Sequence, residues 1–509
     1  MKNPEGTNHI VTPLSMLLAR AKDFPNETVL IAGDERWSAA RLASASERLA
    51  RAFHSIGVRP GDRVALHMFN IVEAVVAYLA CFRSGAIALP LNTRYKTKEL
   101  ENWIARVKPI LYLGEAELHS SFASVPDQLL SPNARFVVGL EQASDRARPW
   151  ADLLGRAVAQ TETAQPDFDA PAVLLATSGT TGPSKLVVWT QRTLAALKPS
   201  AEGRGVSGSD IVPVVAPLMH GSGVYYMSSA LLLGAVAVLV PRFDPDEVLD
   251  AIERHNCTSF FGLPFMCAQM SRRQRERPRD MRSLRLCTVS GDTCPSDVEQ
   301  AFEAAIGHPL LSFWAAAEDV GATIVGAEVG PYTRPVPEAE ISVVGDAGQL
   351  LLPGEVGEML VRSPTTTPGY WEGPGQVRPL INNVFHSGDL VCRRAHGQLR
   401  YMGRLKDLIV RGGSNISPTE VESVIRNHPA ISDVAVVGLQ DEELGQRVVA
   451  ALVLADGHDR STIPDILNTT RRQIADYKVP EAVIVIDAIP RNALTKVDRR
   501  AVTELFGRY

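Results

Sequence analysis

The first part of the chain alternates short apolar runs with segments whose apolar residues recur at helical spacing. A turn at residues 57–63 precedes an apolar run at 64–66, which is typical of a buried strand. The next segment predicts a helix, because its apolar residues share one face: Val72, Val75, Val76 and Leu79. Gly85 ends this helix, and residues 86–91 predict another strand. Such units pair their strands in parallel and recur to about residue 310, so the pattern predicts an α/β fold.

Beyond that point the pattern favours an antiparallel region, with short strands between glycine-rich turns at residues 340–344, 357–361 and 398–402. A boundary is expected near Asp407, which gives an N-terminal domain of residues 1–406 and a C-terminal domain of residues 407–509. In the second domain, Ser417 and Glu420 predict a capping box at a helix that opens with Pro418. The remainder predicts a small α+β unit with strands at residues 433–438, 448–454 and 482–486.

The longest apolar stretch, residues 224–240, is interrupted by Gly234 and ends at Pro241. It is shorter than the roughly 20 residues that a membrane span requires, and a buried helix, a glycine turn and a strand explain it better. The N-terminal residues lack the basic and apolar regions of a secretory signal. A cytoplasmic location is therefore expected.

Composition indicates a globular protein rather than a disordered or disulfide-scaffold chain, with 45% hydrophobic and 21% charged residues in a length of 509. The 52 Lys and Arg residues nearly balance the 57 Asp and Glu residues, which argues against a polyanionic partner. No basic patch or amphipathic anchor indicates a nucleic acid or membrane partner. The six cysteines are scattered without a metal-ligand spacing, so we expect reduced core residues.

A polar loop follows the apolar run at residues 174–176 and has the composition of a phosphate cradle. Glycines let backbone N–H groups approach an oxyanion, hydroxyls donate further hydrogen bonds, and a lysine adds positive charge. The loop does not match the Walker pattern, and the alternative is a surface turn. The unbroken run favours phosphate binding by these residues: Thr177, Ser178, Gly179, Thr180, Thr181, Gly182 and Lys185.

The loop sequence TSGTTGPSK resembles the signature of acyl- and aryl-CoA synthetases in the adenylate-forming superfamily, which also includes peptide-synthetase adenylation domains and luciferases. The resemblance extends in order over essentially the whole chain. It implies that ATP and a carboxylate form an acyl-adenylate, which a thiol, usually that of CoA, converts to a thioester. It also implies Mg²⁺, a large N-terminal domain of stacked mixed sheets with helices plus a small barrel-like part, and a small mobile α+β C-terminal domain.

The segments at residues 386–390 and 403–407 resemble the nucleotide-binding and hinge motifs of this family. The resemblance implies that Asp389 binds both ribose hydroxyls, which suits the two oxygens of a carboxylate, and that Arg404 also contacts the nucleotide. Asp407 is implied as the hinge between the domains. Gly412 and Gly413 resemble the segment that lines the CoA tunnel, although both could simply form a turn.

Residues 490–499 resemble the loop that carries the adenylation lysine of the family, with Thr495 in place of the more frequent glycine. This implies that Lys496 lies between the carboxylate and the α-phosphate, where a cation offsets their repulsion. The alternative is a solvated lysine in a basic tail. The resemblance assigns catalytic roles to Lys496, Glu318, Thr180 and Lys185.

Three segments resemble those that form the acyl pocket of the family, at residues 217–221, 260–264 and 290–292. The implied pocket residues are His220, Gly221, Phe261, Ser290, Phe313 and Ala315, and Gly291 and Asp292 are implied to contact the nucleotide. His220 receives no acid–base role, because a histidine among apolar residues is more often packed than catalytic. The apolar and aromatic residues nearby favour an alicyclic, polycyclic or aromatic acid.

The adenine and magnesium motif departs from the family pattern of Tyr-Gly, any residue, Thr-Glu. Here it consists of Trp314, Ala315, Ala316, Ala317 and Glu318. Trp314 can still stack on adenine, and Glu318 can still bind Mg²⁺ through a carboxylate oxygen. Ala317 cannot donate a hydrogen bond, and the loss of such a donor typically costs about 10²–10³ in rate unless another group compensates.

These losses affect the first half-reaction, so we consider two alternative functions besides that of a complete ligase. One is a weakly adenylating or non-adenylating enzyme that converts a preformed acyl-adenylate to the thioester, with a separate adenylating enzyme as partner. The other is a catalytically silent nucleotide-binding protein, which predicts damage to Asp389, Arg404 or Lys496 that the sequence does not show. A carrier protein in place of CoA is a further possibility, and no particular oligomeric state is predicted.

Overall fold

The structure, a computed structural model, describes residues 10–157, 167–177, 184–326, 330–412, 414–441, 443–491 and 496–507. One sheet has nine strands, in which β8, β4, β3, β5, β6 and β7 are parallel neighbours, and β9, β19 and β20 continue it antiparallel. The strands in spatial order are β20 (Gln376–Pro379), β19 (Gly369–Gly373), β9 (Leu186–Thr190), β8 (Pro171–Ala176), β4 (Ile87–Pro90), β3 (Arg63–His67), β5 (Leu111–Glu115), β6 (Arg135–Val138) and β7 (Arg148–Pro149). The predicted parallel strands on either side of Gly85 are confirmed as β3 and β4.

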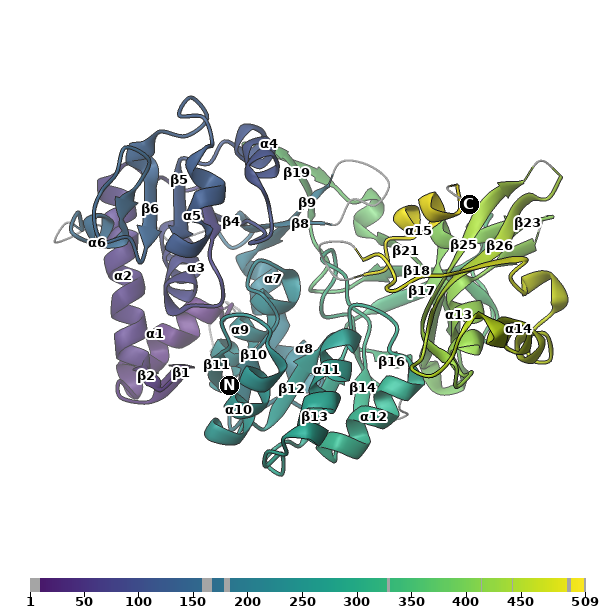
Figure 1. Ribbon diagram of the computed structural model, residues 1–509. Coiled ribbons are helices and arrows are strands. Elements are labelled where there is room, and N and C mark those ends of the chain that lie inside the picture. The colour runs from purple at the N-terminus through teal and green to yellow at the C-terminus, as the bar shows by residue number, and fades with distance from the viewer. Residues whose placement is uncertain are drawn as a thin grey trace.

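A second, four-stranded sheet faces the first across a shared core. It consists of β10 (Ile211–Val214), β11 (Val236–Leu239), β1 (Thr28–Ala32) and β2 (Glu35–Ser38). The core holds residues of both sheets and of several helices, among them α2 (Ala39–Ser55), α3 (Val72–Ser84) and α9 (Gly221–Leu233). Figure 1 shows α3 and α9 between the sheets. This arrangement buries almost the whole of α9, and its N-terminus becomes a fixed point for the site.

Further helices cover the outer faces of these sheets. α4 (Thr97–Val107) and α5 (Ala116–Ala123) pack on the far side of the nine-stranded sheet. The remaining helices of this half are α1 (Pro13–Asp23), α6 (Trp150–Leu154), α7 (Gln191–Ala195) and α8 (Leu197–Gly203). The apolar stretch at residues 224–240 is confirmed as helix, glycine turn and strand, because α9 ends at Gly234 in the left-handed conformation and β11 follows. Within the described residues, no helix combines the length and apolar character that crossing a bilayer demands.

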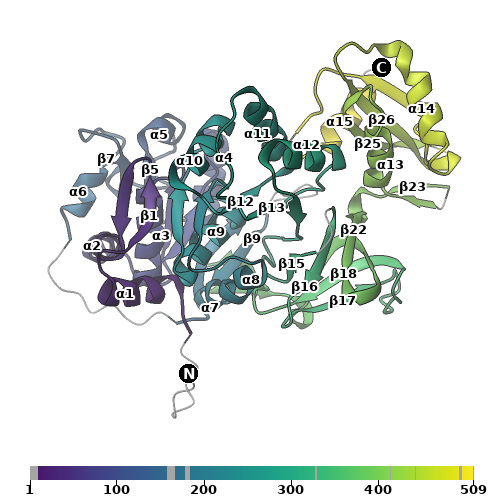
Figure 2. The same cartoon turned by 90° about the horizontal axis from the view of Figure 1, so that it is seen from below.

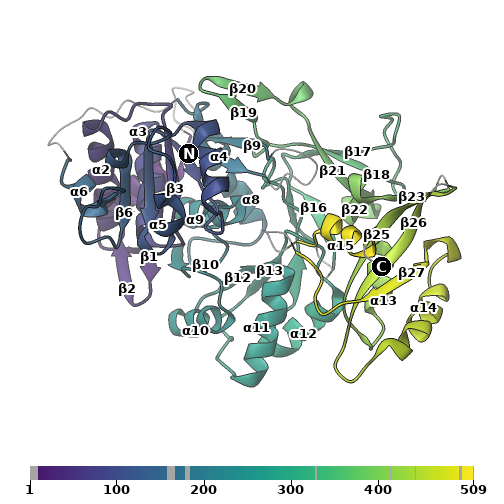
Figure 3. The ribbon, with the colours of Figure 1, turned by 45° about the horizontal axis from the view of Figure 1, so that its top comes forward.

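A three-stranded parallel sheet continues the α/β pattern. Its strands are β12 (Ser259–Gly262), β13 (Leu286–Val289) and β14 (Leu310–Ser312), and its helices are α10 (Pro245–His255), α11 (Pro264–Glu276) and α12 (Ser296–Ile306). Figure 3 shows these helices together on one side of the sheet. All six cysteines are free and five are buried, which confirms the expected reduced core residues.

The antiparallel region is a six-stranded sheet and forms the small barrel-like part. Its order is β15 (Thr323–Val325), β16 (Tyr332–Pro335), β22 (Leu399–Arg404), β21 (Phe385–Arg393), β18 (Val356–Arg362) and β17 (Glu340–Val344). Together with the stacked sheets this confirms the predicted α/β class. The sheet matters for the site because β21 and β22 pair Asp389 with Arg404.

The last part of the chain is a small α+β unit with its own cores. Its sheet contains β24 (Ser414–Ile416), β23 (Ile409–Arg411), β26 (Gly445–Leu454) and β25 (Ile431–Asp441), with β27 (Ala482–Val485) on β26, and its helices are α13 (Pro418–Arg426), α14 (Ile463–Arg471) and α15 (Arg499–Phe506). Figure 2 shows this unit at one end of the molecule, joined to the six-stranded sheet through β22 and β23.

The predicted capping box of α13 is wrong. Ser417 is the N-cap and Pro418 opens the helix, but the Ser417 hydroxyl donates to the carbonyl of Met402 at 2.7 Å. Glu420 instead accepts from Lys478 Nζ, at 2.7 and 2.9 Å. Both side chains therefore bind distant partners and tie the helix to β22 and to the 3₁₀ turn at residues 476–478.

Candidate functional site

The polar loop joins two antiparallel strands, because Ala176 of β8 pairs with Leu186 of β9. At its base, the Thr177 N–H donates to the carbonyl of Lys185 at 2.9 Å, and the Lys185 N–H donates to Thr177 Oγ1 at 3.2 Å. The two strands that flank the loop thus form an antiparallel pair. Residues 178–183 lie outside the described residues, and with them the predicted ligands Ser178, Gly179, Thr180, Thr181 and Gly182.

Asp389 lies at the centre of the predicted nucleotide site. Its carboxylate is buried and accepts from Arg404 Nε at 2.7 Å and from Trp314 Nε1 at 2.8 Å. The structure therefore brings together three residues that the sequence assigned to the nucleotide. A carboxylate oxygen accepts more than one hydrogen bond, so both oxygens retain capacity for the two ribose hydroxyls. The hydrogen bond from Trp314 to Asp389 was not predicted.

Glu318 lies beside Tyr370 and Lys185. The Tyr370 hydroxyl donates to Glu318 Oε1 at 3.1 Å, and Lys185 Nζ lies 4.7 Å from the centre of the Tyr370 ring. Burial raises the pKa of Glu318, and the Tyr370 hydroxyl, Lys185 and Arg404 oppose this rise. Tyr370 was missed because a tyrosine in an apolar strand gives no sequence signal of its own.

The surroundings of Glu318 fit a Mg²⁺ ion that the phosphate oxygens of a bound nucleotide would help to hold. The described residues contain no cluster of three His, Cys, Asp or Glu side chains that could hold a metal ion. Mg²⁺ at nucleotide sites usually takes one or two carboxylates together with phosphate oxygens and water. The Glu318 carboxylate supplies the hard oxygen that such a site requires.

The residue after Glu318 is a buried acid that fixes the motif loop. Asp319 is fully buried and accepts from the hydroxyls of Ser363, Thr365 and Thr366, and the Ala322 N–H donates to it at 2.9 Å. Burial raises its pKa, and these hydroxyls oppose the rise. We call this group the Asp319 clamp. It holds the backbone of Glu318 in place from a loop more than forty residues away.

Two further hydrogen bonds fix the main chain of the motif. The Trp189 Nε1–H donates to the carbonyl of Ala317 at 2.8 Å, and the Thr367 N–H donates to the carbonyl of Glu318 at 2.7 Å. Together with the Asp319 clamp, these bonds position Glu318 through main-chain contacts. The geometry around Glu318 therefore does not depend on a hydroxyl at position 317.

The Asp319 clamp makes a testable contribution to stability. Replacing Asp319 by alanine leaves several buried hydroxyl and N–H donors without their acceptor, and each buried unsatisfied group costs about 1–3 kcal/mol. We expect Asp319→Ala to lower the free energy of unfolding by about 3 kcal/mol, measured by urea unfolding followed by tryptophan fluorescence. Asp346→Ala, at an exposed turn, is the matched control and should change it by less than about 0.5 kcal/mol. Equal unfolding curves for the two variants would refute the clamp.

Lys496 of the small unit lies within electrostatic reach of the nucleotide site. Burial lowers its pKa, while the carboxylates of Asp292 and Asp389 oppose the shift and Arg404 adds to it. Burial also lowers the pKa of His220 to about 4, and Lys496 adds to that shift. The structure thus gathers Lys496 with predicted nucleotide and acyl residues from the rest of the chain.

The residues predicted for the hinge and the CoA tunnel lie in the C-terminal part of the chain, near an open groove. Asp407 lies 3.6 Å from Arg499 Nε, which connects the end of β22 to α15. Gly412 lines an open groove of about 860 Å³ formed by the hinge segment and the loop between β25 and β26. None of the described nucleotide residues named above lines this groove, and Gly413 lies outside the described residues. In this arrangement Lys496 faces the nucleotide site and Gly412 does not.

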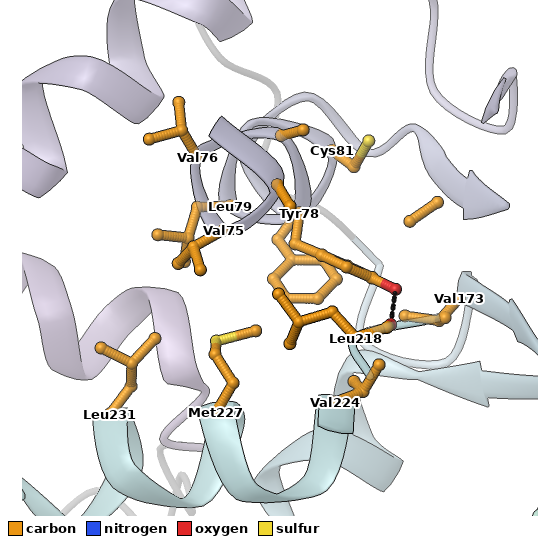
Figure 4. Packing of buried hydrophobic residues seen from close by; sticks show 14 of the residues in the cluster. Val75, Val76, Tyr78, Leu79, Cys81, Val173, Leu218, Val224, Met227 and Leu231 are labelled. Atoms are coloured by element: carbon orange, nitrogen blue, oxygen red, sulfur yellow. Dashed lines mark hydrogen bonds between the residues drawn. The ribbon is translucent and has the colours of Figure 1, made fainter. Parts of the chain in front are cut away.

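The N-terminus of α9 presents His220 and Gly221, and neighbouring elements fix its position. Asn70 Nδ2 donates to the carbonyls of Val214 and Ala216, while the Leu218 N–H donates to Asn70 Oδ1 at 2.8 Å. The Tyr78 hydroxyl donates to the carbonyl of Leu218 at 2.6 Å, and Figure 4 shows this bond beside the packed side chains of α3 and α9. The segment before α9 is therefore anchored to α3, although sequence reasoning named neither Asn70 nor Tyr78.

Buried aromatic rings pack against one another among the residues predicted for the acyl pocket. Phe261 stacks on Tyr226 with ring centres 4.6 Å apart, and Phe313 lies 5.7 Å from Phe261. Ala315 is half-buried against the same core. The buried Ser290 leads into Gly291, which needs glycine because its φ is +88° and a Cβ would lie 2.5 Å from Leu263. Asp292 follows as an exposed side chain within reach of Lys496.

Comparisons with known proteins agree with this geometry. The family model described as AMP-binding enzyme matches residues 17–371, and the model described as AMP-binding enzyme C-terminal domain matches residues 420–496. Indoleacetate–CoA ligase of Aromatoleum aromaticum is 31% identical over 494 residues, which cover 95% of this chain and 96% of that protein. The 3-[(3aS,4S,7aS)-7a-methyl-1,5-dioxo-octahydro-1H-inden-4-yl]propanoyl:CoA ligase of Mycobacterium tuberculosis is 30% identical over 516 residues, which cover 98% and 99%. Among solved structures, o-succinylbenzoate coenzyme A synthetase of Bacillus subtilis, in complex with ATP and a magnesium ion, matches with a TM-score of 0.81 and 28% identity, and covers 95% of this chain and 98% of that chain.

Proposed function

Because the chain belongs to the family of AMP-binding enzymes, the adenylate-forming acid–thiol ligases, we propose that it converts a hydrophobic ring-bearing carboxylic acid to its CoA thioester. The proposal rests on one observation above all. Asp389, Arg404 and Lys496 come from separate segments of the chain and lie within electrostatic reach of one another, and Lys496 also reaches His220 at the start of α9. A silent nucleotide-binding protein has no need for this cation.

In the first half-reaction, a carboxylate oxygen attacks the α-phosphorus of ATP and pyrophosphate leaves. Both reactants are anionic, and Lys496 is the cation that would offset their repulsion and the charge that develops during attack. Asp389 would hold the ribose, so that the α-phosphate is presented in one orientation. Mg²⁺, held by Glu318, would neutralise charge on the phosphates of ATP.

In the second half-reaction, the thiol of CoA attacks the acyl carbon and AMP leaves. The Gly412 segment is the proposed tunnel wall, yet its groove is separate from the nucleotide residues in this arrangement. A rotation of the C-terminal domain, residues 407–509, about Asp407 would exchange Lys496 for Gly412 at the site. Domain closure around a hinge is a common way to run two steps at one site.

The walls of the pocket favour an aromatic or alicyclic acid. Phe261, Tyr226 and Phe313 present flat apolar faces, which bind rings better than flexible polar chains. The two relatives described above are named for an indole acid and for a bicyclic propanoic acid. Neutral His220, at the N-terminus of α9, adds no charge that would select an amino acid.

A split assay tests the proposed function. Purified protein is given a panel of ring-bearing acids with MgATP, and pyrophosphate release is measured. In parallel, synthetic acyl-adenylates and CoA are supplied, and thioester formation is measured. We expect both activities with the same acids. Thioester formation from adenylates with no pyrophosphate release from any acid would instead support an enzyme of the second half-reaction that depends on a separate adenylating partner.

A further inference from the structure

Arg204, the residue that follows α8, is a buried arginine with unpaired donors. Only 2% of its surface is exposed, and it forms no ion pair with an acid among the residues that the structure describes. Its Nη2 donates to the carbonyls of Val320 and Thr323, at 2.7 and 3.1 Å. Its Nε and Nη1 have no partner among those residues. A buried guanidinium stays charged, so unpaired donors at this place are costly unless a ligand supplies acceptors.

Arg204 borders a small internal cavity whose walls are largely apolar, with Val206, Phe260 and Leu286 among them, and carry a few polar groups. Besides Arg204, the lining includes Tyr226, Ser259 and Thr288. The Tyr226 hydroxyl lies 3.4 Å from Thr288 Oγ1, which itself donates to the carbonyl of Phe260 at 3.2 Å. The free volume is roughly that of one water molecule, so the cavity has room for a single oxygen atom and its hydrogen bonds.

This cavity adjoins the aromatic residues assigned to the acyl pocket. The guanidinium carbon of Arg204 lies 4.0 Å from the centre of the Phe313 ring, and Phe313 also contacts Phe261. Tyr226 contributes to the cavity and stacks on Phe261. An acid whose carboxyl reaches Lys496 and whose ring lies among these aromatic residues therefore points its far end toward Arg204.

We propose that Arg204 is a specificity-determining residue that binds an oxygen acceptor, a carboxylate or a ketone, at the end of the acid remote from the reacting carboxyl. The inference rests on the proposed function, because it names the substrate class of the same pocket. An apolar far end would leave Nε and Nη1 without acceptors, whereas an oxygen there satisfies them. A purely structural role explains the two bonds from Nη2 to backbone carbonyls but not the two unpaired nitrogens.

The test compares three para-substituted phenylacetates that differ only in the far group, a methyl, an acetyl or a carboxylate. Dissociation constants from calorimetry and kcat/KM for thioester formation are measured for wild type and for Arg204→Met. In wild type, at least one of the two oxygen-bearing acids should be preferred to the methyl acid. A hydrogen bond to a charged group is worth about 10- to 100-fold in binding, so the preference should fall by that factor in Arg204→Met. The comparison of acetyl with carboxylate shows which oxygen source is favoured.

Two controls separate this role from a structural one. Arg204→Lys keeps the charge and should retain part of the preference, and Glu202→Met, an exposed change at the same helix, should retain all of it. Because each variant is scored by a ratio between acids, partial loss of folded protein does not move the result. An equal loss of affinity for all three acids in Arg204→Met would overturn the inference. A preference that depends on Arg204 in binding, without turnover of any acid, would support the subsite and count against the ligase.

Discussion

Lys496→Ala should lower the rate of pyrophosphate release by about 10²–10³-fold, while thioester formation from a supplied acyl-adenylate stays within about threefold. The cation offsets charge only while the carboxylate attacks the α-phosphate, because the repulsion between these two anions is gone once the adenylate has formed. The two half-reactions are measured separately, as single turnovers. An equal loss in both would show that Lys496 serves binding or folding rather than adenylation.

The pH dependence of the first half-reaction is an independent test of the role of Lys496. Burial lowers the pKa of Lys496, and the active form is the cation, which is lost as pH rises through that lowered pKa. Adenylation should therefore decline on the alkaline side earlier than an ordinary lysine would predict. Lys496→Arg should remove this decline, because a guanidinium does not titrate in the range. Lys478→Ala, at a lysine paired with Glu420, is the matched control and should keep the decline.

The local elements could be predicted because their signals lie within a few residues of one another. The apolar face of Val72, Val75 and Leu79 is set by helical periodicity, and the glycine at 234 ends α9 whatever surrounds it. The prediction of a capping box was wrong because the actual partners of its two side chains lie far away in the sequence. Ser417 and Glu420 have the right spacing, but Met402 and Lys478 offer them tertiary partners that no local pattern reveals.

The sequence names the candidate residues of the site but not the contacts between them. Asp389 and Arg404 were found from their motifs, yet their contact follows from the antiparallel register of β21 and β22. The hydroxyls of the Asp319 clamp come from the loop at residues 363–366, which the sequence alone shows only as a polar turn. Arg204 is a single arginine after a helix, and only the packing around it shows that two of its nitrogens are unpaired.

Asp389→Ala should impair both half-reactions, in contrast to Lys496→Ala. The carboxylate would hold the ribose in ATP and in the acyl-adenylate alike, and two hydrogen bonds to a charged group together are worth about 10²–10⁴-fold in affinity. We expect kcat/KM for ATP and kcat/KM for the acyl-adenylate to fall by factors in this range, with AMP binding by calorimetry weakened to match.

The hydrogen bond from Trp314 allows the role of the carboxylate to be separated from that of the ring beside it. Trp314→Phe keeps an aromatic face for adenine but removes the Nε1–H that donates to Asp389. Asp389 keeps its charge and its bond to Arg404, and the lost N–H contacts Asp389 rather than the nucleotide, so we expect both rates to fall by less than about 10-fold. A loss in Trp314→Phe as large as that in Asp389→Ala would mean that the tryptophan, and not the acid, holds the nucleotide. If Asp389→Ala impaired only pyrophosphate release, the proposal that Asp389 binds the ribose in both half-reactions would be wrong.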